Sequence, residues 1–174
     1  ILFLSPTGFS KSRKDIKFVL SKKSSATINE NNNSSEPNIV SRTEWAIESA
    51  KGELLRLTPE GIWIFSTRTK FDKKDRESNI KNLRDMQEDN FSRGLTDIAY
   101  HYYIDPAGSI WEGRPILYKG DTPYRALKLE NNIAICVIGE FSEIPPSDSQ
   151  IESISKLINY LKINYTLQDD KILS

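Results

Sequence analysis

Residues 131–141 read NNIAICVIGEF, and this stretch decides the fold class. From Ile133 to Ile138 every side chain is apolar, whereas a strand with one face in water would alternate apolar and polar residues. The pattern predicts a central strand that is covered on both faces. Such strands are typical of α/β domains, in which helices pack against a mixed or parallel sheet.

Further strands are expected upstream of this stretch. Residues 61–67 (GIWIFST) have the β-branched and aromatic composition of a buried strand. Residues 97–105 (DIAYHYYID) and 109–114 (SIWEGR) flank a turn that contains Pro106 and Gly108, which predicts a hairpin. Together with the central strand, these segments predict a mixed sheet.

Two helices are expected to flank the sheet. Ser78 is the predicted N-cap of the first helix, which ends before Gly94 and carries apolar residues at a spacing of three: Ile80, Leu83 and Met86. Ser149 and Glu152 have the spacing of a capping box for the second helix. Its apolar stripe predicts packing against the core: Ile151, Ile154, Leu157, Ile158 and Leu161.

The amino-terminal part of the chain has a different composition. We predict an N-terminal extended arm at residues 1–20, a polar linker at 21–37 and one α/β domain at 38–174. In the arm, residues 16–20 alternate in a way that permits a short strand added to a neighbour's sheet edge, and disorder explains the same pattern equally well.

Charge and hydrophobicity argue against a nucleic-acid-binding protein and against a transmembrane protein. Lys and Arg total 24 and Asp and Glu total 24, so net charge gives no reason to expect nucleic acid as a partner. Six basic residues lie between Lys11 and Lys23, either as a solvated tail or as a contact for an anionic surface. No run approaches the roughly 20 apolar residues that span a bilayer. The chain starts at Ile1 without Met, and we expect any targeting segment upstream of it.

Four segments carry a resemblance to a known family. They are IVSRTEW at 39–45, DIAYHYYID with GSIWEGR at 97–114, NNIAICVIGEF at 131–141 and the helix end at Tyr165–Leu167. Their order and spacing resemble the peptidoglycan-recognition and bacteriophage-type N-acetylmuramoyl-L-alanine amidases over about residues 39–174. The resemblance implies a mixed sheet flanked by helices.

The resemblance also implies where a zinc site would lie. Active members hold zinc with two histidines and a cysteine and leave the fourth position for the attacking water. Here Phe65 takes the place of the first histidine and has no lone pair to offer. The register set by Tyr165 and Leu167 places Asp170 at the second, and the cysteine position falls beyond Ser174. We therefore expect no metal or other cofactor.

Three further residues bear on the site. Tyr100 matches the family's active-site tyrosine and is either a ligand contact or a half-buried strand residue. Thr122 stands where the family has a histidine that lines the groove. His101 is the single histidine of the chain, and we expect it to be structural because a lone histidine is a poor ligand set. Cys136, in the apolar strand, is expected to be a buried, inert thiol.

The remaining candidates for ligand binding are basic or aromatic. Each is either a groove residue that meets carboxylates of a muramyl peptide or an ordinary surface residue: Arg68, Arg114, Tyr124 and Arg125. For Arg114, which follows Gly113, we expect a structural salt bridge with a carboxylate.

These residues lead to three hypotheses for function. The first is a catalytically inactive amidase-like domain, a scaffold that contacts other proteins of a cell-envelope assembly, in part through residues 1–20. The second is binding of peptidoglycan without hydrolysis, and the least favoured is a zinc-dependent amidase. A glycosidase that uses carboxylates such as Glu112 and Glu140 has no specific support. The resemblance implies a periplasmic, secreted or envelope-associated location.

Overall fold

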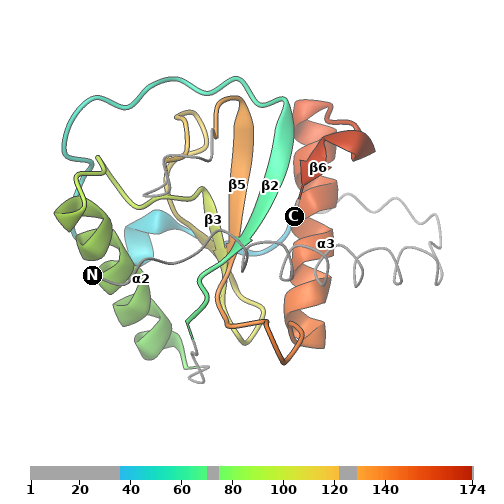
Figure 1. Cartoon of the computed structure of the whole chain (residues 1–174), viewed down its shortest axis with the longest axis horizontal. Helices are drawn as coiled ribbons and strands as arrows, with labels where there is room; N and C mark the ends of the chain where they lie inside the picture. Colours follow the sequence, from blue (N-terminus) through green and yellow to red (C-terminus); the bar gives the residue numbers. More distant parts are fainter. Residues whose placement is uncertain (1–35, 70–74, 122–128, 174) are drawn as a thin grey trace.

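The computed structural model describes residues 36–69, 75–121 and 129–173. A six-stranded mixed sheet, in the order β1-β4-β3-β5-β2-β6, lies between two helices (Figure 1). The strands are β1 (Ile39–Val40), β2 (Gly61–Ser66), β3 (Tyr102–Ile104), β4 (Ile110–Glu112), β5 (Asn132–Val137) and β6 (Ile172–Leu173). The predicted α/β class with a mixed central sheet is confirmed.

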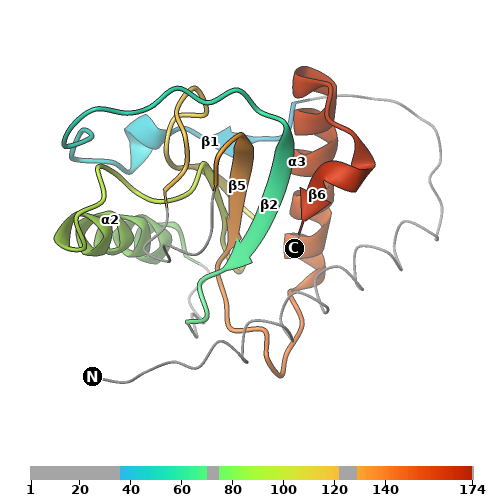
Figure 2. The same ribbon diagram turned by 45° about the horizontal axis from the view of Figure 1, so that its top comes forward.

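The helices cover opposite faces of the sheet. In the described residues the helical segments are α2 (Arg76–Ser92), α3 (Asp148–Tyr165) and two short 3-10 helices, η2 (Arg42–Glu44) and η3 (Asp169–Lys171). Figure 1 and Figure 2 show α2 on one side of the strands and α3 on the other. Each face of the sheet therefore has its own hydrophobic core.

Strand β5 lies between β3 and β2 and supplies side chains to both cores. Ile133, Ile135 and Val137 pack with α3, whereas Ala134 and Cys136 pack in the cluster that contains Leu83 of α2. This alternation follows from the two-residue repeat of a strand. The prediction that 131–141 holds a strand covered on both faces is confirmed.

The predicted hairpin is confirmed, but its first strand is shorter than the segment 97–105. Strands β3 and β4 pair antiparallel, with Tyr103 opposite Trp111. The adjacent carbonyls of Tyr100 and His101 both accept hydrogen bonds, from the amides of Arg114 (2.9 Å) and Gly113 (2.8 Å). A regular ladder does not pair adjacent carbonyls in this way, so the regular strand begins only at Tyr102.

Helix α2 starts earlier than expected. Its N-cap is Asp75, whose side chain accepts a hydrogen bond (2.8 Å) from the amide of Ser78, so the prediction of Ser78 as N-cap is wrong. Leu83 is buried as predicted, and Ile80 and Met86 are partly buried. The helix also buries polar side chains, which a simple apolar stripe does not predict: Asn79, Gln87 and Asn90.

Helix α3 confirms its predicted apolar stripe and corrects its cap. All five residues of the stripe are buried. The capping box consists of Ser147 and Gln150, two residues before the predicted pair of Ser149 and Glu152. Both pairs have capping-box spacing, and the extended backbone at Ser147 (φ −62°, ψ 157°) makes it the N-cap.

The arm at 1–20 and most of the linker at 21–37 lie outside the described residues. Within the described ranges, no helix is long and apolar enough to cross a membrane.

The cap of α3 gives a direct test of the helix boundary. We expect Ser147→Ala to lower the free energy of unfolding by about 1 kcal/mol, because the side chain satisfies an otherwise unpaired amide at the helix start. Ser149→Ala is the matched control and should change stability by a few tenths of a kcal/mol at most. Urea unfolding measures both variants, and a larger loss in Ser149→Ala would contradict the observed cap.

Candidate functional site

Phe65 is enclosed by aromatic rings at the end of β2. Its ring stacks on that of Trp63 (centroids 5.8 Å apart, planes at 30°) and on that of Tyr100 (4.9 Å, 18°). The side chain is 8% exposed and belongs to the core on the α2 side. The position that the family resemblance assigns to a metal ligand is therefore filled by a packed hydrocarbon ring.

A hollow of about 220 Å³ lies next to Tyr100. One wall comes from α2 and includes Met86, Asp89, Asn90 and Arg93. The opposite wall comes from the carboxyl end of β2 and includes Ser66, Thr67 and Thr69, and Tyr100, Tyr103 and Cys136 are also in contact with the space. The hollow combines hydroxyl, amide and charged groups with aromatic rings.

Sequence reasoning missed the wall contributed by α2. Asn90 is 7% exposed, and Arg93 pairs with Asp89 at 2.8 Å. These residues lie beyond the apolar stripe of the helix, so their position beside the hollow depends on the rotation of α2 about its axis. One local signal is the glycine at the helix end, where the amide of Gly94 donates a hydrogen bond (3.0 Å) to the carbonyl of Phe91 next to Arg93.

Gly113 holds the backbone of Tyr100 in place. A Cβ at Gly113 would lie 2.4 Å from the carbonyl oxygen of Tyr100 and 2.8 Å from the ring of Tyr103. Only glycine permits this approach without a shift of the backbone. The hydroxyl of Tyr103 in turn accepts a hydrogen bond (3.3 Å) from the amide of Tyr100.

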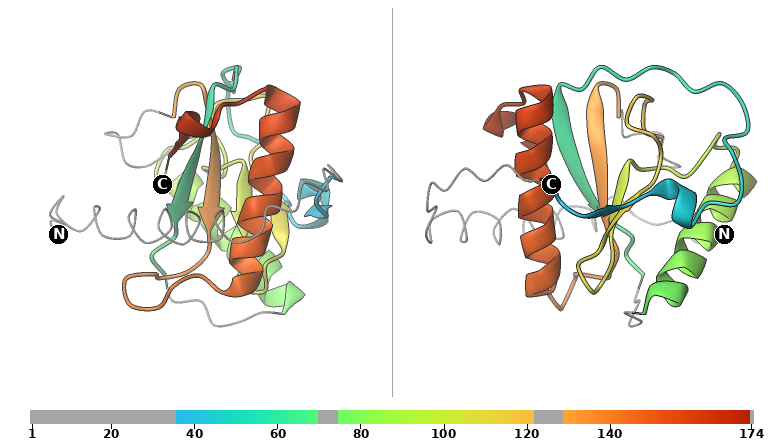
Figure 3. Two further views of the ribbon diagram at one scale, coloured as in Figure 1. Left: turned by 90° about the vertical axis from the view of Figure 1, so that its right-hand side faces the viewer. Right: turned by 180° about the vertical axis from the view of Figure 1, so that it is seen from behind.

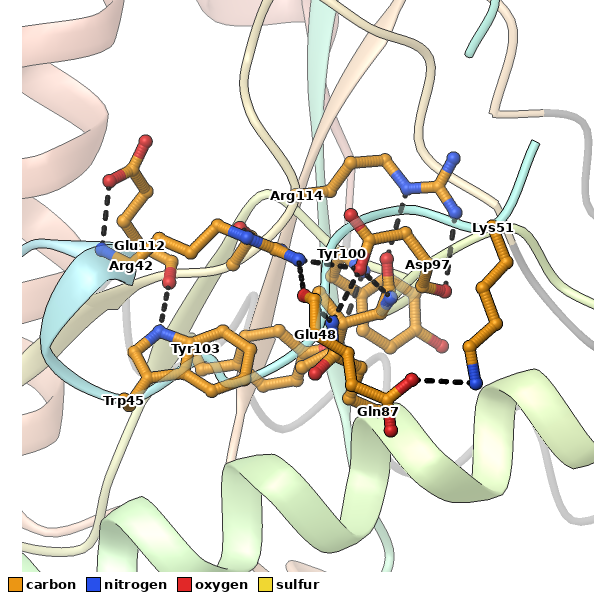
Figure 4. A network of polar contacts seen from close by, with 12 residues as sticks. Arg42, Trp45, Glu48, Lys51, Gln87, Asp97, Tyr100, Tyr103, Glu112 and Arg114 are labelled. Carbon is orange, nitrogen blue, oxygen red and sulfur yellow. Dashed lines mark hydrogen bonds and ion pairs between the residues drawn. The ribbon is translucent and has the colours of Figure 1, made fainter. Parts of the chain in front are cut away.

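A buried carboxylate anchors the segment that precedes Tyr100. Oδ1 of Asp97 accepts hydrogen bonds from Nη2 of Arg42 (2.8 Å) and Nε2 of Gln87 (2.9 Å), and Asp97 is 1% exposed. The guanidinium of Arg42 also donates to the carbonyl of Gly113 (2.9 Å). Figure 4 shows these side chains together with Trp45, whose indole nitrogen donates to the carbonyl of Glu112 (2.7 Å).

Arg114 is part of this framework, and among the described residues its guanidinium forms no salt bridge of the predicted kind. It is 3% exposed, and its guanidinium donates to the backbone carbonyls of Ile98 (2.9 Å), Lys119 (3.1 Å) and Asp97 (3.3 Å). Burial lowers the pKa of Arg114, although the nearby carboxylates oppose this shift. The expected structural role is correct, and the partners of the guanidinium are backbone carbonyls.

Arg68 lies between two residues of the hollow without lining it. Its backbone adopts a left-handed conformation (φ 56°), and its amide donates to the carbonyl of Gly139 (3.1 Å). The hydroxyl of Thr67 accepts a hydrogen bond (3.0 Å) from the amide of Gly139. The side chain of Arg68 is exposed, so its role as a ligand contact stays a prediction.

His101 has the structural role that was expected. It is fully buried, its Nδ1 accepts a hydrogen bond (2.8 Å) from the amide of Ala134, and its Nε2 lies 2.8 Å from the carbonyl of Tyr118. These two contacts require a neutral ring with the proton on Nε2. Burial is the main reason why the pKa of His101 falls from 6.5 to about 4.

The register that placed Asp170 at the second ligand position is wrong. Asp170 lies in η3, and β6 then pairs parallel with β2 so that Ile172 is opposite Ile62 and Leu173 opposite Trp63. Asp170 comes two residues before Ile172 and so lies near the amino end of β2, whereas Phe65 is three residues, or about 10 Å, beyond Ile62 along the strand. In this register the position beside Phe65 lies two residues past Leu173, outside the sequence.

The described residues do not fit a zinc ion. Within the described parts of the chain, no group of three or more His, Cys, Asp or Glu residues could hold a metal. Cys136 is opposite Phe65 in the sheet, and burial strongly raises the pKa of its thiol, which disfavours the thiolate form that binds metals. The ring of Phe65 stands where the family resemblance places the first ligand.

Three predicted residues remain untested. Thr122, Tyr124 and Arg125 lie outside the described residues, so their proposed places beside the groove stay predictions.

Comparison with known proteins identifies the family to which this fold belongs. A family model described as N-acetylmuramoyl-L-alanine amidase matches residues 56–174. The chain belongs to this family. The resemblance that the sequence motifs indicated is thereby confirmed.

Individual relatives are peptidoglycan recognition proteins. Human peptidoglycan recognition protein 3 is 28% identical over an alignment of 141 positions, and the match covers 75% of this chain and 40% of that protein. The chain thus spans about two-fifths of the length of this relative. Among solved structures, bumblebee PGRP-SA is 26% identical with a TM-score of 0.70, and the match covers 79% of this chain and 82% of that one.

One similar structure contains a ligand. Peptidoglycan recognition protein LE was solved in complex with tracheal cytotoxin, a monomeric diaminopimelic acid-type peptidoglycan. It is 25% identical, with a TM-score of 0.67, and the match covers 77% of this chain and 80% of that one. The family therefore includes amidases and proteins that bind fragments of peptidoglycan.

The buried histidine predicts a pH dependence of stability. Because the pKa of His101 is lowered on folding, the unfolded chain binds a proton between pH 6.5 and about 4 that the folded chain does not. Stability should be unaffected by this group above pH 6.5 and should fall as the pH drops toward 4, by about 3 kcal/mol in total.

His101→Asn keeps an acceptor for the amide of Ala134 but cannot titrate, so it is the matched control. We expect the variant to lose some stability at pH 7.5 and to show a flatter dependence on pH than the natural chain. Urea midpoints at pH 7.5, 6 and 5 measure the difference. Equal slopes in the two proteins would contradict the assignment.

Proposed function

We propose that this domain binds muramyl peptides of peptidoglycan in the hollow beside Tyr100 and does not hydrolyse them. The observation that carries this proposal is the stack of Phe65 on Tyr100, at 4.9 Å between centroids, in place of a metal ligand. In this proposal the domain is a pseudoenzyme that keeps the groove of the amidase fold.

The case against hydrolysis is the ligand count. A catalytic zinc in this family needs three protein ligands and an open position for water. With Phe65 at the first position, at most two ligands of the family set remain, wherever they lie. A phenyl ring that is 8% exposed and packed between two other rings also leaves no room for the ion.

The case for binding is the chemistry of the hollow. Muramyl peptides carry hydroxyls, amides and carboxylates next to apolar lactyl and alanine groups. The walls offer matching groups: the amide of Asn90, the guanidinium of Arg93, the hydroxyls of Thr67 and Thr69 and the ring of Tyr100. At about 220 Å³ the hollow is smaller than a typical ligand pocket, so we expect it to hold only part of such a ligand.

The second candidate is the scaffold in a cell-envelope assembly that acts through protein contacts. It is favoured by the closed surroundings of Phe65. A domain that acts only through protein contacts needs no open space for a small ligand at this position. Either function places the chain in the periplasm, in the envelope or outside the cell, where peptidoglycan and its binding proteins meet. Retention on peptidoglycan distinguishes the two candidates.

Co-sedimentation with insoluble peptidoglycan tests the first candidate. We expect the protein to pellet at low salt equally well in EDTA and in added zinc, because no ligand contact depends on a metal. We expect no release of free stem peptide in either buffer. Absence of pelleting, pelleting that requires zinc, or release of peptide would each contradict the proposal.

Variants locate the binding site. We expect Tyr100→Ala to weaken binding about tenfold, the effect of losing about 1.4 kcal/mol of contact energy. Arg93→Gln should weaken it as well. Tyr160→Ala is the matched control, since this tyrosine lies on α3 and does not line the hollow. A thermal melt of each variant checks folding, and equal loss of binding in the control would contradict this location.

A further inference from the structure

A second, larger cavity lies at the opposite end of the sheet from β6. It has a volume of about 590 Å³ and is lined by Val40 of β1, Arg76 of α2 and Lys156 and Tyr160 of α3, among others. Strand β1 is the outermost strand on this side. Since the two helices cover opposite faces of the sheet, a cavity lined by both must wrap around the edge of β1. The right-hand view in Figure 3 shows β1 in front, with α3 and α2 to either side.

The edge of β1 offers backbone groups to a partner. Among the described residues, Ile39 and Val40 pair only with Ile110 and Trp111 of β4. In an edge strand, alternate residues direct their N–H and C=O groups away from the sheet, where an extended peptide can pair with them. Ile39 packs into the core on the α3 side and Val40 into the core on the α2 side, so this strand is fixed in place.

Cations flank this edge on both faces. Arg76 forms an ion pair with Glu44, and both side chains are about half exposed. Lys156 pairs with Glu152 at 2.8 Å, and their side chains are 63% and 65% exposed. Exposed ion pairs of this kind contribute only about 0–1 kcal/mol, so a peptide carboxylate can replace the present partner at little cost.

The acidic residue of the cavity is engaged by a neighbour. Glu36 accepts a hydrogen bond (3.0 Å) from the hydroxyl of Tyr160. On the same wall, Ile163 is 62% exposed and presents apolar surface to the cavity. The edge is thus bordered by two cations and an apolar side chain, and the one carboxylate that lines the cavity among the described residues is held by Tyr160.

We propose that the outer edge of β1, which pairs with no other described strand, takes up an extended peptide that carries two adjacent acidic residues. Successive side chains of a strand point to opposite faces. An added strand would therefore direct one carboxylate toward Arg76 and the next toward Lys156, while its backbone pairs with β1. This surface is separate from the hollow beside Tyr100. In the scaffold function, it would be the place where the domain binds another protein.

A short synthetic peptide tests the proposal with the full chain. The probe is a blocked, fluorescein-labelled peptide of the sequence threonine, valine, glutamate, glutamate, valine, threonine, followed by fluorescence polarisation. One analogue replaces both glutamates with glutamine, and another carries N-methyl groups at alternate residues and cannot complete a strand ladder. We expect both analogues to bind at least about tenfold more weakly than the probe.

Protein variants and hydrogen exchange place the peptide. The double variant Arg76→Gln, Lys156→Gln should bind the probe at least about tenfold more weakly. Lys81→Gln is the matched control, because Lys81 is an exposed cation on α2 that does not line the cavity. The bound peptide should also slow amide exchange at residues 38–41.

Several results would overturn the proposal. They are absence of binding at millimolar peptide, equal binding of the N-methylated analogue, no effect of the double variant, or slowed exchange at the hollow instead of at β1. A dimer in sedimentation that excludes the probe would identify a second copy of the chain as the occupant and would also overturn it. Peptidoglycan pelleting is unaffected by any of these outcomes, so the two sites are judged separately.

Discussion

The buried carboxylate of Asp97 is the interaction on which the site depends. A carboxylate that is 1% exposed is costly unless it is paired and hydrogen-bonded, and here Arg42, Gln87 and the amide of Ile98 all donate to it. These donors come from η2, from α2 and from the segment that leads into β3. One charged group therefore joins three parts of the chain next to the hollow.

The remaining polar contacts extend this anchor to Tyr100. The guanidinium of Arg114 binds the carbonyls of residues 97 and 98, and Gly113 lets the β4 end approach the carbonyl of Tyr100. The EGR turn at 112–114 thus acts on backbone position and not on a ligand directly. Because Tyr100 is fixed in this way, its ring can stack on Phe65 and close the place where a metal ligand would stand. The site can keep its shape without a metal.

The parts of the fold that depend on local pattern were predictable from the sequence. The continuous apolar run at 133–138 and the stripe on α3 specify burial directly, and Phe65 could be recognised as a non-ligand from its chemistry alone. The caps were harder to place. Around α3, Ser147 with Gln150 and Ser149 with Glu152 both have capping-box spacing, and only the backbone conformation distinguishes them.

The features that the sequence did not reveal depend on how distant segments pair. Asp170 was misplaced because the register of β6 against β2 is set by strand pairing and not by the residues before it. Asn90 and Arg93 were missed because the rotation of α2 decides which of its polar residues meet the hollow. The partners of Arg114 were predicted wrongly as well. They are three backbone carbonyls of other segments, and the sequence around Arg114 does not show that these carbonyls lie nearby. In each case the missing information was three-dimensional.

The most direct test of the central claim is an NMR titration of the chain with a soluble muramyl peptide in the presence of a chelator. If the domain recognises this ligand without a metal, the amide signals of residues 66–69 and 89–93 and of Tyr100 should shift with saturation, and adding zinc should not alter the affinity. Shifts that appear only with zinc, or saturating shifts confined to other surfaces, would contradict a metal-free binding site beside Phe65.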